Sequence, residues 1–142
     1  MISRKRLIES KVREYLQSED SPAALKELQM LVSRERTTKV TPTLHVLLSP
    51  IAVTEGFEDL DSLELTGTLN IAVLTSSDDT TQAESDALVD HVDTMMRDTE
   101  AVKEAVNHDD AVLYSIVLQG LEEEIQERAE VVVLSYAVTF RA

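Results

Sequence analysis

The stretch LELTGTLNIAVLT, residues 63–75, decides the fold of this chain of 142 residues. Its apolar residues recur at every second position, which is the period of a β-strand with one buried face. They are Leu63, Leu65, Leu69, Ile71 and Val73. Gly67 interrupts the alternation, and a glycine inside a strand pattern predicts a bulge. The stretch therefore predicts a bulged strand that covers a core with one face.

A second strand is predicted just before this one. Residues 42–54 are rich in β-forming side chains, and Pro50 interrupts them. Proline has no N–H to donate to a neighbouring strand, so this strand is expected at a sheet edge or with a bulge near Pro50. An acidic turn or loop is expected at residues 55–59. Residues 42–75 are therefore predicted to form a β-hairpin.

Helices are predicted over residues 80–107, after the hairpin. Thr81 and Glu84 have the spacing of a capping box, in which each side chain bonds a free backbone N–H at the start of a helix. An apolar stripe with helical spacing follows, made of Leu88, Val92, Met95 and Met96. A short helix from Thr99 to Val106 is expected to extend this region.

Residues 111–141 predict a second hairpin. Residues 111–119 form a mostly apolar run, which is typical of a strand covered on both faces. Residues 128–140 alternate, with an apolar face of Val132, Leu134, Tyr136, Val138 and Phe140. The connection at residues 120–127 is acidic and is expected to be a solvated turn or loop.

The N-terminal segment, residues 1–41, is predicted to be helical. Leu7, Ile8, Val12, Tyr15 and Leu16 share one stripe of a first helix. Leu25, Leu28, Leu31 and Val32 could form the stripe of a second helix after Pro22, and residues 34–41 are expected to be a loop. The whole chain then has the order α(α)-β-β-α(α)-β-β. This order predicts a single α+β domain over residues 1–142, with a four-stranded mixed or antiparallel sheet and helices packed on it.

Charge divides the chain into two unequal parts. Residues 1–45 hold nine Lys or Arg against six Asp or Glu, a balance of +3, whereas residues 46–142 hold four against 21, a balance of −17. Such a field repels nucleic acid and anionic lipid over most of the surface. The distribution has two readings: it keeps the protein soluble, or it keeps one face from adhering to a polyanion.

Patterns that carry catalysis are absent from the sequence. There is no cysteine, and the three glycines are too far apart for a nucleotide-binding loop. His45, His91 and His108 do not form a metal-binding motif, and Asp59–Asp61 lacks the glycine of a calcium loop. No apolar run is long enough for a signal peptide or a membrane helix. We therefore expect a soluble, cytosolic protein without enzymatic activity, metal, cofactor or membrane contact.

The layout resembles a known family. The N-terminal amphipathic helix leads to a hairpin ending in NIAVLT at residues 70–75, then to a polar linker and the helix of Leu88, Val92 and Met95. Two strands close the chain and end in YAVTFR at residues 136–141. This pattern resembles the tail terminator, or tail-completion, proteins of tailed bacteriophages, although the second N-terminal helix is a possible departure.

The resemblance implies a homo-oligomeric ring, usually a hexamer, that caps the tail tube and joins it to the neck and head. Such a protein would assemble in the host cytoplasm and then reside in the virion. DNA would pass through its lumen, and an acidic lumen would repel phosphate and let DNA slide. The alternative is a monomeric intracellular adaptor or regulatory domain that binds one protein partner through a single apolar patch.

Two groups of residues are expected to carry assembly. The predicted subunit contacts are Leu7, Ile8, Val12, Leu16 and the sheet edge near Pro50. The predicted acidic loops of the lumen hold Glu55, Glu58, Asp59, Asp61, Glu122, Glu123, Glu124 and Glu127, because loops reach furthest into a ring opening.

Overall fold

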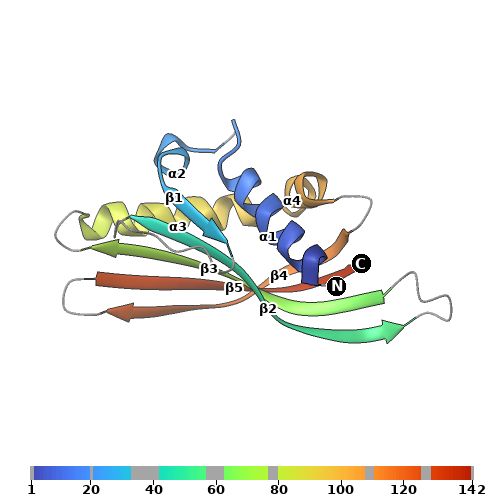
Figure 1. The fold of residues 1–142 in the computed structure, drawn as a ribbon. Coiled ribbons are helices and arrows are strands. Elements are labelled where there is room, and N and C mark those ends of the chain that lie inside the picture. The colour runs from blue at the N-terminus through green and yellow to red at the C-terminus, as the bar shows by residue number, and fades with distance from the viewer. Residues whose placement is uncertain are drawn as a thin grey trace.

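A mixed sheet of five strands carries helices on one of its faces (Figure 1). This computed structural model describes residues 2–19, 21–32, 42–56, 63–76, 80–107, 111–125 and 129–141. The strands are β1 (Gln29–Val32), β2 (Thr43–Gly56), β3 (Leu63–Ser76), β4 (Val112–Ile125) and β5 (Ala129–Arg141). The helices are α1 (Ile2–Leu16), α2 (Ala23–Lys26), α3 (Gln82–Arg97) and α4 (Thr99–Val106). The predicted α+β class is confirmed.

The sheet order is β1-β2-β3-β5-β4, which makes β1 and β4 the two edges. Both predicted hairpins are present, because β2 pairs antiparallel with β3 and β4 pairs antiparallel with β5. The hairpins join through β3 and β5, which pair over their full lengths, from Glu64 opposite Arg141 to Ser76 opposite Ala129. Only β1 is parallel to its neighbour, β2.

The prediction of four strands was wrong, because residues 29–32 form the short strand β1 instead of continuing a second helix. α2 ends at Lys26. Leu28, Leu31 and Val32 have helical spacing, but a run this short fits either structure. The outcome depends on pairing with Thr43–Val46, which lies more than ten residues along the chain. The loop predicted at residues 34–41 lies outside the described residues.

β2 has two register shifts against β3, at Leu48–Ile51 and at Val53–Glu55, and the first of them confirms the bulge expected near Pro50. The register shifts between Leu48, opposite Leu69, and Ile51, opposite Gly67, so β2 holds one residue more than β3 there. The bulge predicted in β3 at Gly67 was wrong, since β3 keeps an unbroken register with β5. Gly67 instead lies opposite the bulge.

Helix α3 begins as the capping box predicts. The backbone N–H of Glu84 donates to Thr81 Oγ1 at 3.2 Å, and the Thr81 hydroxyl donates to Glu84 Oε1 at 3.1 Å. The predicted stripe of Leu88, Val92, Met95 and Met96 is buried. A buried hydrogen bond of 3.0 Å between Thr75 and Ser85 also links α3 to β3.

One core lies between the helices and the sheet. β5 contributes its even-numbered residues from Val132 to Phe140, as its alternation predicts, and β3 contributes Leu65, Leu69, Ile71 and Val73. α1 contributes Ile8, Val12 and Leu16 and contacts β1, β2 and α4. In the part of the chain that the structure describes, none of the helices is long and apolar enough to span a membrane.

Candidate assembly surface

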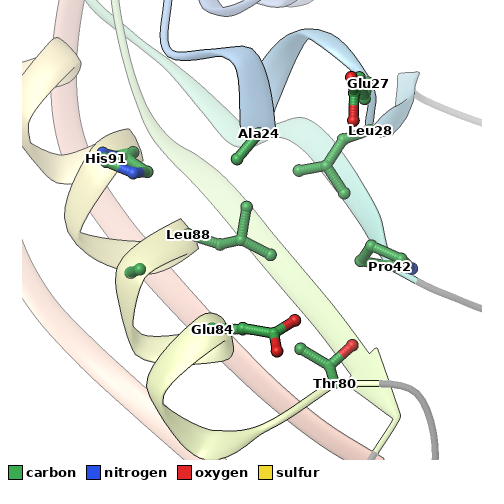
Figure 2. Close-up of a pocket in the computed structure, with 9 residues that line it drawn as sticks. Ala24, Glu27, Leu28, Pro42, Thr80, Glu84, Leu88 and His91 are labelled. Carbon is green, nitrogen blue, oxygen red and sulfur yellow. The ribbon is translucent and has the colours of Figure 1, made fainter.

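A cavity of about 430 Å³ lies between α2 and α3 (Figure 2). Leu88 points from α3 toward Ala24 and Leu28, so the middle of the cavity is apolar. Its polar side chains are Glu27, Thr80, Glu84 and His91; Thr80 lies next to Glu84, whereas Glu27 and His91 lie apart from them. The Glu84 carboxylate already accepts the Thr81 hydroxyl. This cavity lacks the convergent titrating groups that a catalytic site requires.

The histidines lie on different parts of the chain. His45 lies in β2 and His91 lies in α3, and His108 lies outside the described residues. The described residues contain no group of three or more His, Asp or Glu side chains that could hold a metal ion.

The edge strand β4 exposes apolar side chains that a monomer would normally bury. Among the side chains that the structure describes, which leave out those of residues 49–63, the large hydrophobic ones that are exposed belong to β4. They are Tyr114, Val117, Leu118, Leu121 and Ile125, with exposed fractions of 46%, 59%, 37%, 53% and 72%. The run at residues 111–119 was predicted to be covered on both faces, and that prediction was wrong: β4 is at the edge and its second half has no helix over it.

The exposed side chains lie on both faces of the sheet. Leu118 pairs with Tyr136, and Leu121 pairs with Leu134, so both point to the face that carries the helices. Ile125 pairs with Glu130 on that same face. Val117 pairs with Ala137 and points to the opposite face.

The predicted acidic loop at residues 120–127 is largely strand, which corrects the sequence-based expectation. β4 continues to Ile125, so Glu122, Glu123 and Glu124 alternate across the edge of the sheet. Register with β5 places Glu123 on the helix-bearing face and Glu122 and Glu124 on the other. Consecutive glutamates disfavour a strand by propensity, but pairing with β5 outweighs this preference.

A groove between α3 and the β4–β5 hairpin combines apolar walls with carboxylates. Its cavity volume is about 290 Å³. Val89, Leu121 and Val132 supply the apolar part. The same groove is lined by four acidic side chains and no basic one: Asp86, Asp90, Glu123 and Glu130. Glu130 Oε1 is buried and has no hydrogen-bond partner among the described atoms. We call this feature the acidic groove.

Helix α1 carries the opposite charge. Five basic residues lie within it, Arg4, Lys5, Arg6, Lys11 and Arg13, against Glu9 and Glu14. Two of these bases have acidic neighbours on the same helix: Lys5 lies 3.8 Å from Glu9, and Lys11 lies 3.4 Å from Glu14. Arg6 is exposed. The outward side of α1 is therefore basic.

The structure distributes the predicted assembly residues over several places. Ile8, Val12 and Leu16 are buried in the chain's own core, with Leu7 packed against it, so their contacts lie within the chain. Pro50 and Glu55 lie in β2. Glu58, Asp59, Asp61 and Glu127 lie outside the described residues. Among the predicted acidic residues, the side chains of Glu122, Glu123 and Glu124 are described, and they lie beside the exposed apolar residues of β4.

Several residues of this surface were not predicted from the sequence: Asp86, Asp90, Leu118, Leu121, Ile125 and Glu130. One feature of the sequence could have predicted part of the surface. Leu121 and Ile125 flank three glutamates, and apolar residues in so polar a stretch suggest a strand whose one face meets a partner. No local pattern indicates that α3 lies beside that strand.

Comparisons with known proteins find matches to solved structures. No family model matches the sequence, and no curated protein matches it. Among solved structures, 34 chains are similar. One is a chain of the "Virion of native gene transfer agent (GTA) particle", with a TM-score of 0.59 and 15% sequence identity over 94% of each chain. At this identity the match shows a shared fold.

Proposed function

We propose that this protein is a structural, non-enzymatic component of a virion, of the tail terminator type. It would form a ring, in our proposal a hexamer, that caps the tail tube and joins it to the neck and head. The observation that supports the proposal most is the shared fold with a chain of a gene transfer agent virion, which extends over 94% of both chains. The layout of helices and hairpins that suggested this family agrees with it.

The charge distribution fits a lumen through which DNA passes. Residues 46–142 carry a balance of −17, and Glu122 and Glu124 lie on the helix-free face at the edge of the sheet. A ring that exposes such carboxylates to its opening would repel phosphate and keep DNA mobile. The protein would assemble in the host cytoplasm and remain in the virion, in contact with tail-tube and neck proteins.

Electron microscopy of isolated tail tubes tests this role. Purified protein is added to tubes that lack their terminal ring, and the tube ends are imaged. We expect a ring of density at one end of each tube. Free ends after incubation with excess, folded protein would contradict the proposal.

The second candidate is a monomeric intracellular adaptor that binds one protein partner. The exposed apolar side chains of β4 favour it, because exposed apolar surface is typical of a protein-binding domain. Sedimentation velocity distinguishes the two candidates, since an adaptor remains a monomer at all concentrations and a ring protein associates.

A further inference from the structure

We propose that the acidic groove is an interface between copies, and that it receives the basic outward side of α1 from a second copy of this chain, with Arg6 as the principal cation. This inference deepens the proposed function and rests on its ring. It names the two surfaces that would meet.

The groove leaves apolar side chains exposed to solvent in the monomer. α1, α3 and α4 cover the rest of this face of the sheet, yet Leu121 and Ile125 remain 53% and 72% exposed there. Burying apolar surface of this kind against a partner stabilises a complex, because the area is removed from water. A partner that covers the end of β4 would therefore stabilise the complex, whereas the chain's own helices leave these side chains exposed.

The charges of the groove indicate that a partner should supply a basic side chain. Four carboxylates line one small space with no Lys or Arg among the lining residues, and Glu130 Oε1 is buried without a hydrogen-bond donor. A lysine or arginine side chain fits both parts of this lining, because its aliphatic stem packs on apolar walls and its charged end donates to carboxylates. Removal of the carboxylates from water is offset only if such a cation arrives with the partner.

The chain itself carries the matching surface. α1 holds five of the chain's 13 Lys and Arg, and Arg6 is exposed. Elsewhere in the described part the bases occur singly: Arg97 is engaged by Asp93 at 2.8 Å, Lys26 donates to the Glu19 carbonyl at 2.9 Å, Lys103 lies in α4 and Arg141 ends β5. The basic surface that best complements the groove is therefore α1.

Position in the sheet makes the contact head-to-tail. α1 packs on β1, β2 and α4, whereas the groove lies between α3 and the end of the β4–β5 hairpin, so the two surfaces are distinct parts of the molecule. When α1 of one copy occupies the groove of a second, the first copy keeps a free groove and the second keeps a free α1. Further copies can therefore add at both ends. Contacts of this type close into rings or continue as filaments.

Sedimentation velocity of matched variants tests the proposal. Arg6→Glu and Glu123→Lys each place like charges at the contact, and we expect each to weaken association of the wild type at least about 10-fold, which is the loss typical of a central interface residue. Leu121→Ser should act in the same direction. Val117→Ser is the control, because Val117 lies on the opposite face of the same strand, and it should leave association unchanged.

Mixing the variants identifies the partner. Arg6→Glu protein keeps an intact groove and Glu123→Lys protein keeps an intact α1, so each alone should be a monomer while an equimolar mixture associates. Association of the Arg6→Glu variant by itself would show a contact that does not use α1 and would overturn the proposal. A monomeric wild type, or equal loss with Val117→Ser, would also overturn it.

The outcomes separate this inference from the proposed function. If the wild type forms rings on tail tubes and the groove variants do so equally well, the ring stands and the assigned contact is wrong. If the mixed variants associate as expected but the wild type never binds tail tubes, the contact stands and the virion role is wrong. Circular dichroism of each variant confirms that it is folded.

Discussion

At the scale of single residues, Glu9 joins α1 to the sheet at the point where β2 loses its parallel neighbour. β1 pairs with β2 only as far as Val46. Two residues further on, the Leu48 N–H donates to Glu9 Oε2 at 2.7 Å, and Lys5 lies 3.8 Å from the same oxygen. A fully buried carboxylate thus satisfies a backbone donor that no described strand reaches.

Replacing Glu9 should therefore destabilise the protein strongly. Glu9→Ala leaves a buried N–H without this acceptor and Lys5 without its partner, and we expect a loss of about 3 kcal/mol in the free energy of unfolding. Urea denaturation measures it. Glu14→Ala is the matched control, because that side chain is 66% exposed, and it should change stability by less than about 0.5 kcal/mol.

Tyr136 predicts a dependence of stability on alkaline pH. Burial, and next the nearby Asp93 carboxylate, raise the pKa of Tyr136 above its ordinary value of about 10. Above pH 10 the unfolded chain therefore loses this proton while the folded chain keeps it, so this contribution to stability is present below pH 10 and falls as pH rises further.

Tyr136→Phe should remove the part of the stability loss above pH 10 that comes from the Tyr136 hydroxyl. We expect its free energy of unfolding to fall less steeply than that of the wild type above pH 10, after a loss of about 1 kcal/mol at pH 7 from the 3.4 Å hydrogen bond to Asp93. Urea titrations at several pH values measure both. Tyr114→Phe, at an exposed position, should follow the wild-type profile, and identical slopes for all three proteins would contradict the prediction.

At the scale of elements, the start of α3 depends on one hydroxyl. Thr81→Ala removes the acceptor of the Glu84 N–H and should cost about 1 kcal/mol, measured as a lower midpoint of thermal unfolding. Thr94→Ala, at an exposed position inside the same helix, should be neutral or slightly stabilising, because alanine has the higher helix propensity. A loss at Thr94 equal to that at Thr81 would show that capping is not the cause.

Elements with a strong period of their own were predictable. α1, α3, α4, β3 and β5 each carry an apolar stripe at helical or strand spacing, and the structure has each of them close to its expected place. β1 and the second half of β4 were not predictable. Neither has a period of its own, and both owe their conformation to pairing with strands distant along the chain or across a turn.

At the scale of the whole molecule, the proposed ring makes a prediction for DNA. Replacing Glu122 and Glu124 together by lysine should leave the fold nearly intact, because both side chains are exposed and lie on the face opposite the acidic groove. It should hinder DNA passage, since the lumen would attract phosphate instead of repelling it. Infectivity or gene transfer by particles that carry this variant measures the effect, and normal transfer would remove the segment from the lumen.

Val117→Ser would be the companion control in that experiment. It alters the same face of the same strand without adding positive charge. If it reduced transfer as much as the double lysine variant does, the cause would be defective assembly, and assembled particles counted by microscopy would fall with it.

The sequence by itself determined the fold class, the two hairpins, the central helices and the acidic balance, because local periodicity, capping and composition are properties of neighbouring residues. Only the tertiary structure decided the fifth strand, the regular register of β3 at Gly67 and the acidic groove. The groove needs α3 beside the end of β4, and its members Asp86, Asp90, Leu121 and Glu130 are far apart or unremarkable in sequence. Strand order at a sheet edge depends on non-local pairing, and that pairing leaves apolar side chains of β4 exposed.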